Sequence, residues 1–437
     1  MRTSTFSQIV KIGLHFFGVW PYLPSTVLFR SYCIMALSTA QVFQYGYVVV
    51  NSDTDNFSEF MDGVSSAMAS SLLFIKLIIL WINQRKFSEI LQIMTMNWQD
   101  HSSNHHSLSI MTKTTFLARR ISRIIILMQF FSVFFYSLGV LAANAGDPEK
   151  WEPYNRELIL KMKLPFEIST YRIYVTITVV QFVHLMFVGW GITVVNTLLV
   201  TLVRSSCVRT DVSDRICTNR EGFDFFVMSL CDHEIQSVSP KHTRVPLKVD
   251  SLRQILHIGG QIDILRDWLT RAFSRNESEP SDKITSRLLI TKHQQIILLS
   301  ENIENLYTYI AFMILFSDTL IICCLGFVIA TSVGEPNAAA ILVKSFMFYV
   351  TMNLDVFIYC YAGEYLSAKS KMIGEAAYDS LWYDVAAKDS QIVLFIILRS
   401  QKRLTITCGK IMDLSLERFT SVVKASASYM SVLLAMY

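Results

Sequence analysis

Among the ionisable residues inside stretches that are otherwise apolar, six are the first candidates for chemistry in this chain. Such groups are costly in lipid, so they normally face protein or water. We expect the Lys76 amine, near a helix end, to reach back to the membrane surface. We expect Asp355 to form a structural ion pair with a neighbouring helix, and His184 to be a hydrogen-bonded interior residue rather than a ligand. The other three residues are Asp318, Lys344 and Lys424.

A second cluster combines cysteine and histidine in the polar stretch 204–248, but its spacing matches no tight zinc pattern. Its members are Cys207, Cys217, Cys231, His233 and His242. The sequence also lacks a glycine-rich phosphate loop, paired catalytic carboxylates and a Ser/His/Asp signature. We therefore expect no metal site, no cofactor, no enzymatic activity and no nucleic-acid partner.

The elements that must position these residues are membrane-spanning helices. Of the 437 residues, 52% are apolar and only 17% are charged, and the mean hydropathy is +0.39. These values are typical of an integral membrane protein. The predicted fold class is all-α, a polytopic membrane protein with seven transmembrane helices. The predicted spans are 29–50, 57–80, 121–143, 171–203, 307–333, 338–366 and 415–437.

The distribution of lysine and arginine predicts the orientation. Basic residues concentrate in the N-terminal segment and in every second loop, that is, in the segments 1–28, 81–120, 204–306 and 367–414. By the positive-inside rule, the N-terminus is cytoplasmic and the C-terminus extracellular. This orientation is the reverse of a G-protein-coupled receptor, and the seventh span also lacks an Asn-Pro-x-x-Tyr motif. The predicted outer segment 51–62 holds a glycosylation sequon at Asn56.

This orientation divides the chain into alternating membrane and cytoplasmic parts. We expect a cytoplasmic N-terminal segment (1–28), transmembrane helices one to four with their loops (29–203), a cytoplasmic loop with helical extensions (204–306), helices five and six (307–366), a cytoplasmic segment with a helix before the last span (367–414), and the last helix (415–437). Two amphipathic patterns precede the fifth span, and the second runs into it without a breaker. Their apolar stripes need partners, which predicts a cytoplasmic assembly domain of helical extensions.

The last span carries one stripe of small and polar residues along its length. The stripe consists of Ser421, Lys424, Ala425, Ser428 and Ala435. One large aliphatic residue, Val432, lies within it. A helix lining a narrow water path has such a stripe, but close packing of small residues against another helix produces the same pattern. Helix geometry leaves both interpretations open, and a lysine on the stripe opposes permeating cations.

Aromatic, small and hydroxyl side chains gather in the outer halves of the second, third, fourth and sixth spans. Such a lining suits a small, mostly apolar molecule with one or two hydrogen-bonding groups. Aromatic residues at these depths also serve ordinary packing and interface roles. The candidate ligand-binding residues are Ser65, Met68, Phe135, Tyr136, Gly139, Tyr174, Thr178, Gln181, Phe346, Tyr349 and Val350.

Several motifs near the C-terminus carry a family resemblance. They are Phe357-Ile358-Tyr359-Cys360-Tyr361 followed by Gly363, Ala377-Tyr378 with Trp382-Tyr383, Leu398-Arg399-Ser400-Gln401-Lys402, Thr407-Cys408-Gly409-Lys410, and Leu414-Ser415-Leu416-Glu417 followed by Phe419-Thr420. With these motifs, and with Gly18-Val19-Trp20-Pro21 before the first span, the chain resembles the insect odorant receptor family. The predicted orientation agrees with that family.

The resemblance implies a tetrameric, odorant-gated, non-selective cation channel in which each subunit contributes its last helix to one central pore. The expected partners are a small volatile odorant, a shared co-receptor subunit and membrane lipid. The expected location is the plasma membrane, in the sensory dendrite of olfactory neurons. The C-terminal residues differ from the co-receptor's Gln-Leu-Lys-type terminus, which favours a tuning subunit. A co-receptor-like homomeric channel and a metabotropic receptor are the alternatives.

The resemblance also assigns residues to the pore. It implies that Val432 forms a hydrophobic constriction, with Met436 one turn further out and Ser428 one turn further in. Ala435 stands where the co-receptor has a polar residue. The expected pore and gate residues are therefore Ser428, Val432, Ala435 and Met436.

Overall fold

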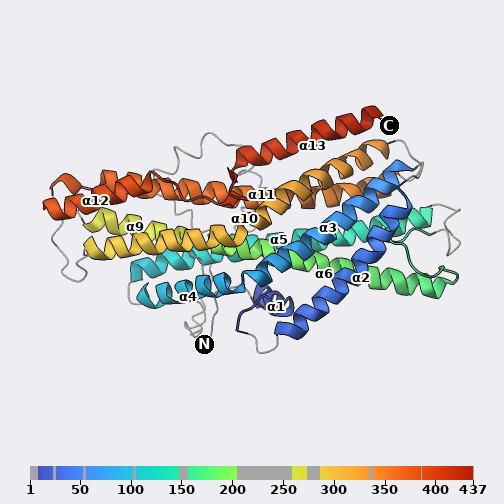
Figure 1. The fold of residues 1–437 in the computed structure, drawn as a ribbon, viewed down its shortest axis with the longest axis horizontal. Helices are drawn as coiled ribbons and strands as arrows, with labels where there is room; N and C mark the ends of the chain where they lie inside the picture. The colour runs from blue at the N-terminus through green and yellow to red at the C-terminus, as the bar shows by residue number, and fades with distance from the viewer. Residues whose placement is uncertain are drawn as a thin grey trace, which may run out of the picture.

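The computed structural model is an elongated bundle of long helices (Figure 1). It describes residues 8–22, 26–52, 56–101, 105–146, 156–203, 258–272, 286–333, 338–384 and 386–436. The helices are α1 (Gln8–Phe16), α2 (Thr26–Val50), α3 (Phe57–Ile82), α4 (Gln84–His101), α5 (His105–Gly146), α6 (Tyr171–Val203), α9 (Ile258–Ala272), α10 (Ser286–Thr331), α11 (Ala338–Asp379), the 3₁₀ turn η5 (Trp382–Asp384), α12 (Ala387–Ser400) and α13 (Leu416–Met436). Two short strands, β1 (Thr407–Cys408) and β2 (Met412–Asp413), form an antiparallel hairpin.

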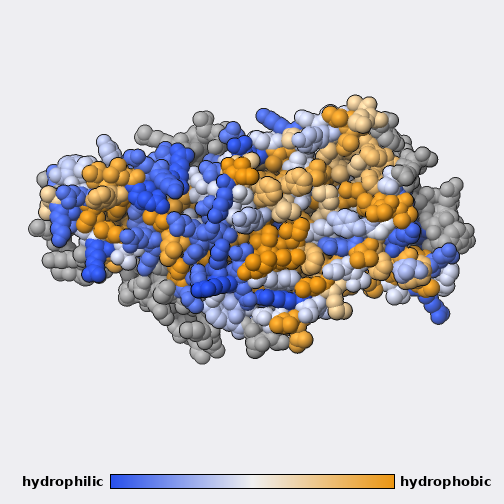
Figure 2. Space-filling model, viewed as in Figure 1, coloured by the Kyte–Doolittle hydropathy of each residue, from blue (hydrophilic) through white to orange (hydrophobic). Residues whose placement is uncertain are grey.

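Within these ranges, seven helices are long and apolar enough to cross a membrane. They are α2, α3, α5, α6, α10, α11 and α13, and each overlaps one of the predicted spans. The all-α, seven-helix membrane architecture is therefore confirmed. Apolar residues cover much of the half of the surface around α13, α3 and α2, whereas hydrophilic residues dominate the region towards α9 and α12 (Figure 2).

Helices α10 and α11 form the centre of the bundle. Helix α10 packs against α3, α11 and α13, and α11 packs against α5. Helix α10 has 46 residues and is about 69 Å long at 1.5 Å per residue, roughly twice the 30 Å hydrocarbon thickness. The predicted continuous helix entering the fifth span is confirmed. Helices α9 and α12 pack beside its extension at one end of the molecule (Figure 1).

The end of the bundle that contains α9 and α12 is held by both apolar and ionic contacts. Helix α9 buries Ile262, Leu265 and Leu269 against its neighbours. The Lys369 ammonium of α11 lies 2.7 Å from Asp263 Oδ1 of α9. Burial raises the pKa of Asp263 above its usual value even though Lys369 opposes that shift. The first predicted amphipathic stretch starts at residue 252, and its residues before 258 lie outside the described part of the chain.

A hairpin turn joins α12 to α13 where the sequence predicts a break at Gly409. Gly409 has a φ of +59° and Lys410 a φ of +62°, a conformation that favours glycine. The Gly409 N–H donates to the Thr308 carbonyl at 3.0 Å, and the Lys410 N–H donates to Thr308 Oγ1 at 3.1 Å. The hairpin is thus fixed to α10, and this contact sets where α13 begins.

Helix α13 lies along one edge of the bundle and is largely exposed (Figure 1). Ser426 is its one buried residue, and its hydroxyl donates to the Thr319 carbonyl of α10 at 3.2 Å. The stripe with Ser421, Lys424, Ser428 and Val432 lies on exposed surface of this single chain. The helix therefore rests on α10 through its opposite face.

The predictions for the buried ionisable residues have mixed outcomes. Lys76 does not reach the membrane surface, because its ammonium lies 2.6 Å from Asp355 Oδ2 in the interior. That prediction was wrong, whereas the predicted ion pair of Asp355 is confirmed. The predicted hydrogen bond of His184 is also wrong: within the described residues its Nε2 has no partner, and its ring stacks on Phe187 with centroids 6.4 Å apart. The Lys76 prediction failed because its partner is 279 residues away in the sequence.

Candidate functional site

An interior cavity lies between α3, α5, α6 and α11. Its volume is about 50 Å³, and the walls are mostly apolar. Ligand pockets usually measure about 300–1,000 Å³, so a bound molecule must displace part of this wall. The lining residues are Ser66, Ala69, Ser70, Gln129, Ser132, Val133, Tyr136, Leu160, Leu185, Val188, Gly189, Ile192, Phe348, Thr351 and Met352.

Helical spacing explains why these side chains meet. On α5, Gln129, Ser132, Val133 and Tyr136 recur at intervals of three and four residues, which places them on one face of the helix. The other three helices present faces with the same kind of spacing. Each helix thus contributes one narrow stripe to the cavity wall.

Hydroxyl groups in the wall are largely occupied by hydrogen bonds within the protein. Ser70 Oγ donates to the Ser66 carbonyl at 3.1 Å, and Thr351 Oγ1 lies 2.7 Å from Ser132 Oγ. Among the described residues, the Gln129 amide makes no hydrogen bond. Gln129 is therefore the lining side chain best able to bind an alcohol or carbonyl oxygen of a ligand.

Tyr136 contributes an aromatic ring to the cavity wall. Its ring is buried and meets Phe348 edge-on, with centroids 5.7 Å apart. The Lys344 ammonium lies 5.1 Å from the Tyr136 ring centroid and 2.5 Å from Asp62 Oδ2. An ion pair between α3 and α11 therefore lies beside the aromatic part of the cavity wall.

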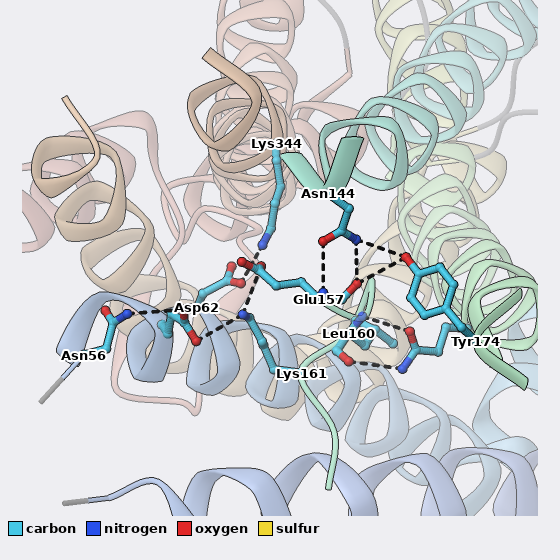
Figure 3. A network of polar contacts seen from close by, with 10 residues as sticks. Asn56, Asp62, Asn144, Glu157, Leu160, Lys161, Tyr174 and Lys344 are labelled. Atoms are coloured by element: carbon cyan, nitrogen blue, oxygen red, sulfur yellow. Dashed lines mark hydrogen bonds and ion pairs between the residues drawn. The ribbon is translucent and has the colours of Figure 1, made fainter. Parts of the chain in front are cut away.

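The segment 156–164, between α5 and α6, forms the outer wall beside this ion pair (Figure 3). Lys161 Nζ lies 3.1 Å from Glu157 Oε2 and 3.3 Å from Glu59 Oε2. Burial favours the neutral amine, but these two carboxylates outweigh it and raise the pKa of Lys161 above its usual value. The lysine remains charged and ties the segment to α3.

Tyr136 is the predicted ligand residue that lines the cavity. Tyr174 and Gln181 are buried nearby but bond to other groups: Tyr174 Oη accepts from Asn144 Nδ2 at 3.0 Å, and Gln181 bonds to the Leu160 backbone. The other predicted ligand residues do not line the cavity. They are Ser65, Met68, Phe135, Gly139, Thr178, Phe346, Tyr349 and Val350.

Several lining residues missed by sequence reasoning are immediate chain neighbours of predicted ones. Ser66 follows Ser65, Ala69 follows Met68, Phe348 precedes Tyr349, and Thr351 follows Val350. One residue corresponds to 100° of helix rotation, so a one-residue offset replaces the lining face by another. The i, i+3, i+4 spacing of Phe348, Thr351 and Met352 was the available signal. No periodic signal marks Leu160, which lies in a non-helical segment.

The other predicted sites lie outside this cavity. Ser428, Val432, Ala435 and Met436 are exposed on α13. Asn56 is exposed just before α3, and its amide donates to Glu59 Oε1 at 3.2 Å. The cysteine and histidine cluster of 204–248 falls outside the described residues. The described ranges contain no group of three or more residues suited to hold a metal ion.

Comparisons with known proteins agree with this architecture. Residues 251–427 match the family model described as "7tm Odorant receptor". The chain is 34% identical to odorant receptor 10 of Aedes albopictus over 149 residues, which cover 34% of this chain and 39% of the relative. It is 29% identical to putative odorant receptor 92a of Drosophila melanogaster over 149 residues, covering 34% and 35%. Over its C-terminal part, the chain is therefore similar to insect odorant receptors.

The chain also shares its fold with a solved structure. The structure of the olfactory receptor OR5 of Machilis hrabei in complex with eugenol matches it with a TM-score of 0.69 at 13% identity, covering 98% of this chain and 97% of the other. The alignments to the curated relatives span less than half of each relative's length. These matches confirm the predicted resemblance, and with the seven long apolar helices they indicate a multi-pass membrane protein. Members of the odorant receptor family are receptors or channels and not enzymes.

Proposed function

We propose that this odorant receptor chain is a subunit of an odorant-gated, non-selective cation channel. A small volatile molecule binds in the cavity between α3, α5, α6 and α11, and α13 lines the pore. The observation that carries this proposal is an interior, mostly apolar cavity that is lined in part by α11. Helix α11 also packs against α13. The eugenol complex of the Machilis receptor, which has the same fold, supports the ligand class.

Helix α11 provides a short route from the cavity to α13. Thr351 and Met352 line the cavity. Five residues beyond Met352, the Phe357 ring meets Phe419 of α13 edge-on, with centroids 5.5 Å apart. A ligand that displaces the α11 wall of the cavity therefore acts on a helix that also contacts the base of α13. This contact supports coupling between ligand binding and the position of α13.

The exposed stripe of α13 supports its role as a pore liner. Its exposed residues include Ser428, Val432, Ala435 and Met436, which a single chain leaves uncovered. In the proposed tetramer with a co-receptor subunit, four such helices surround one axis and Val432 forms the closed constriction. The Lys424 ammonium makes no ion pair among the described residues, and it faces the inner half of the proposed pore.

The proposed orientation places the N-terminus in the cytosol and the C-terminus outside. Segments 1–28, 204–306 and 367–414 are then cytoplasmic, and α9, α12 and the extensions of α10 and α11 hold subunits together. Segments 29–203, 307–366 and 415–437 contain the membrane helices. Asn56 is the proposed extracellular glycan acceptor. The proposed location is the plasma membrane of olfactory dendrites.

Ligand energetics limit what the cavity can do. A ligand shifts the gate only by its preference for the open state, about 1.4 kcal/mol for each tenfold difference in affinity. Because the cavity of about 50 Å³ is smaller than a typical volatile, binding requires the walls to move outward. Expansion of the cavity on binding is the proposed source of that preference.

The decisive experiment is to co-express the chain with the family's co-receptor and to record currents over a panel of volatile compounds. We expect odorant-evoked cation currents that persist in excised patches under G-protein blockade. We also expect Val432→Ala to raise basal conductance and Val432→Lys to reduce cation permeation. The proposal fails if surface-expressed receptor gives no current with any compound and both Val432 variants behave like wild type.

Two controls separate the alternatives. Currents that require G-protein signalling indicate a metabotropic receptor. Currents from this chain expressed without the co-receptor, with tuning unaffected by Tyr136→Ala, indicate a co-receptor-like homomeric channel.

A further inference from the structure

The segment 156–164 is fixed to the helix bundle by two side-chain amides that each bind both backbone groups of one residue (Figure 3). Asn144 Nδ2 donates to the Glu157 carbonyl at 2.8 Å, and the Glu157 N–H donates to Asn144 Oδ1 at 2.9 Å. Gln181 Nε2 donates to the Leu160 carbonyl at 3.1 Å, and the Leu160 N–H donates to Gln181 Oε1 at 3.2 Å. These amides satisfy backbone groups that a buried loop otherwise leaves unpaired.

Further contacts tie the same segment to other helices. Lys161 pairs with Glu59 of α3, and the Lys163 N–H donates to the Phe43 carbonyl of α2 at 3.0 Å. The segment is thus attached to α2, α3, α5 and α6 within the seven residues 157–163. Its backbone cannot recede from the bundle unless several of these bonds break.

Side chains of the segment line two different spaces. Leu160 is 1% exposed and lines the interior cavity. Leu158 and Met162 instead line a separate open groove beside the outer end of α2, together with Tyr47 and Val50. The segment is therefore a partition, and the isobutyl group of Leu160 is its contribution to the interior cavity.

We propose that Leu160 determines the largest ligand that the cavity accepts, and that Gln181 and Asn144 are positioning residues that hold Leu160 in place. This inference rests on the proposed function of the cavity as the odorant site. Most lining residues belong to helices, whereas Leu160 lies in a loop. The Gln181 side-chain amide fixes the Leu160 backbone, and the Asn144 amide fixes that of nearby Glu157. The ligand class is a small volatile with one oxygen, which the unpaired Gln129 amide binds, and an apolar chain whose length is limited by Leu160.

The roles of Gln181 and Leu160 follow from their bonding. Both hydrogen-bonding ends of the Gln181 amide are engaged by the Leu160 backbone, so Gln181 positions the wall and does not bind the ligand. Loss of that amide frees the Leu160 N–H and carbonyl in a buried place, which favours an outward shift of the segment. Such a shift enlarges the cavity without altering any side chain that lines it.

The test uses an agonist identified in the co-receptor assay and its homologues with one to four added methylene groups. For each variant, the measured quantity is the ratio of half-maximal concentrations for the longer and shorter homologues. We expect Leu160→Ala to shift this ratio about tenfold in favour of longer homologues, because one methylene in an apolar pocket is worth about tenfold or more. Leu158→Ala makes the same change on the other side of the partition and leaves the ratio unchanged.

A second arm tests the positioning residues. In hydrogen-exchange measurements on the purified receptor, we expect peptides spanning 156–164 to be protected in wild type and deprotected in Gln181→Ala and Asn144→Ala. Gln181→Ala also broadens tuning towards longer homologues, and Gln181→Glu, which keeps the acceptor for the Leu160 N–H, restores part of the wild-type ratio. Thr176→Ala is the matched control on α6, since its exposed hydroxyl bonds only to its own helix at the Arg172 carbonyl.

The outcomes separate this inference from the proposed function. If Leu160→Ala and Leu158→Ala alter the homologue ratio equally, or if neither alters it while Gly189→Ala weakens every agonist, Leu160 does not select ligands although the cavity binds them. If Gly189→Ala also has no effect, the cavity is not the odorant site, and this inference is overturned with it. Unchanged exchange in Gln181→Ala overturns the positioning role alone.

Discussion

Lys76 Nζ lies 2.6 Å from Asp355 Oδ2, and the two side chains are 0% and 1% exposed. The pair joins α3 to α11 across 279 residues of sequence. Asp318 of α10 is buried near the pair, and both its oxygens lack hydrogen-bond partners among the described residues. The centre of the bundle therefore depends on one lysine to balance buried carboxyl groups.

Removal of one member of this pair is expected to destabilise the receptor strongly. Lys76→Met or Asp355→Leu leaves an unpaired buried charge, which costs about 3–5 kcal/mol. The double variant removes both charges, so we expect it to recover most of the loss. Thermal unfolding of the detergent-solubilised receptor, followed by size-exclusion chromatography, provides the measurement.

Arg85→Ala is the control for this prediction, since Arg85 forms a solvent-exposed pair with Glu89. We expect it to leave the unfolding temperature nearly unchanged. Equal stability of wild type and both single variants would show that the ion pair does not hold α3 to α11.

Gly189→Ala is expected to weaken odorant binding. Gly189 lines the cavity, and an added Cβ would lie 3.1 Å from Gln129 Nε2 and 3.1 Å from Val133 Cγ2. These side chains must shift into an already small space, so we expect half-maximal concentrations to rise about tenfold, as for one methylene in an apolar pocket. Concentration-response curves in the co-receptor assay measure this change.

Gly46→Ala is the matched control, because the same substitution on α2 meets only Lys163 Cβ, at 3.8 Å. Both variants gain the same helix propensity. A similar loss of potency in both variants would mean that the added methyl group acts on folding rather than on the cavity.

Gly363→Ala is expected to disturb the junction between α11 and α13. An added Cβ would lie 2.5 Å from the Leu414 carbonyl oxygen and 2.6 Å from Leu414 Cβ, immediately before α13 begins. Backbone atoms cannot yield as a flexible side chain does, so we expect a loss of about 1–3 kcal/mol and altered basal current. The two measurements are the unfolding temperature and the single-channel open probability. If both values equal those of wild type, the close contact between Gly363 and Leu414 is contradicted.

The orientation of the chain is testable with terminal epitope tags. We expect antibody to label a C-terminal tag on intact cells, and to label an N-terminal tag only after permeabilisation. The reason is that Lys and Arg are concentrated in the N-terminal segment and in the loops predicted to lie on the same side of the membrane. Labelling of the N-terminal tag on intact cells contradicts the proposed orientation.

The number of membrane helices and the family followed from the sequence because both signals are local. A span such as 57–80 is recognised from about 20 consecutive apolar residues, and motifs such as Thr407-Cys408-Gly409-Lys410 are contiguous. The exposed stripe of α13 also followed from helical periodicity. None of these features depends on which other helix lies next to them.

The tertiary structure decided which faces meet. The cavity lies between the four helices to which the sequence assigned the ligand site, but Ser66, Ala69 and Thr351 line it in place of Ser65, Met68 and Val350. One residue of helix rotation is 100°, so an offset of one residue changes the face. Sequence reasoning assigned the Lys76 amine to the membrane surface because its partner is 279 residues away. The sequence carries no signal for Leu160. This loop residue is held in the interior by hydrogen bonds from Gln181 of a separate helix. Local sequence fixes which segments are helical and apolar, whereas burial of a polar or loop residue depends on partners that only packing of the whole chain brings together.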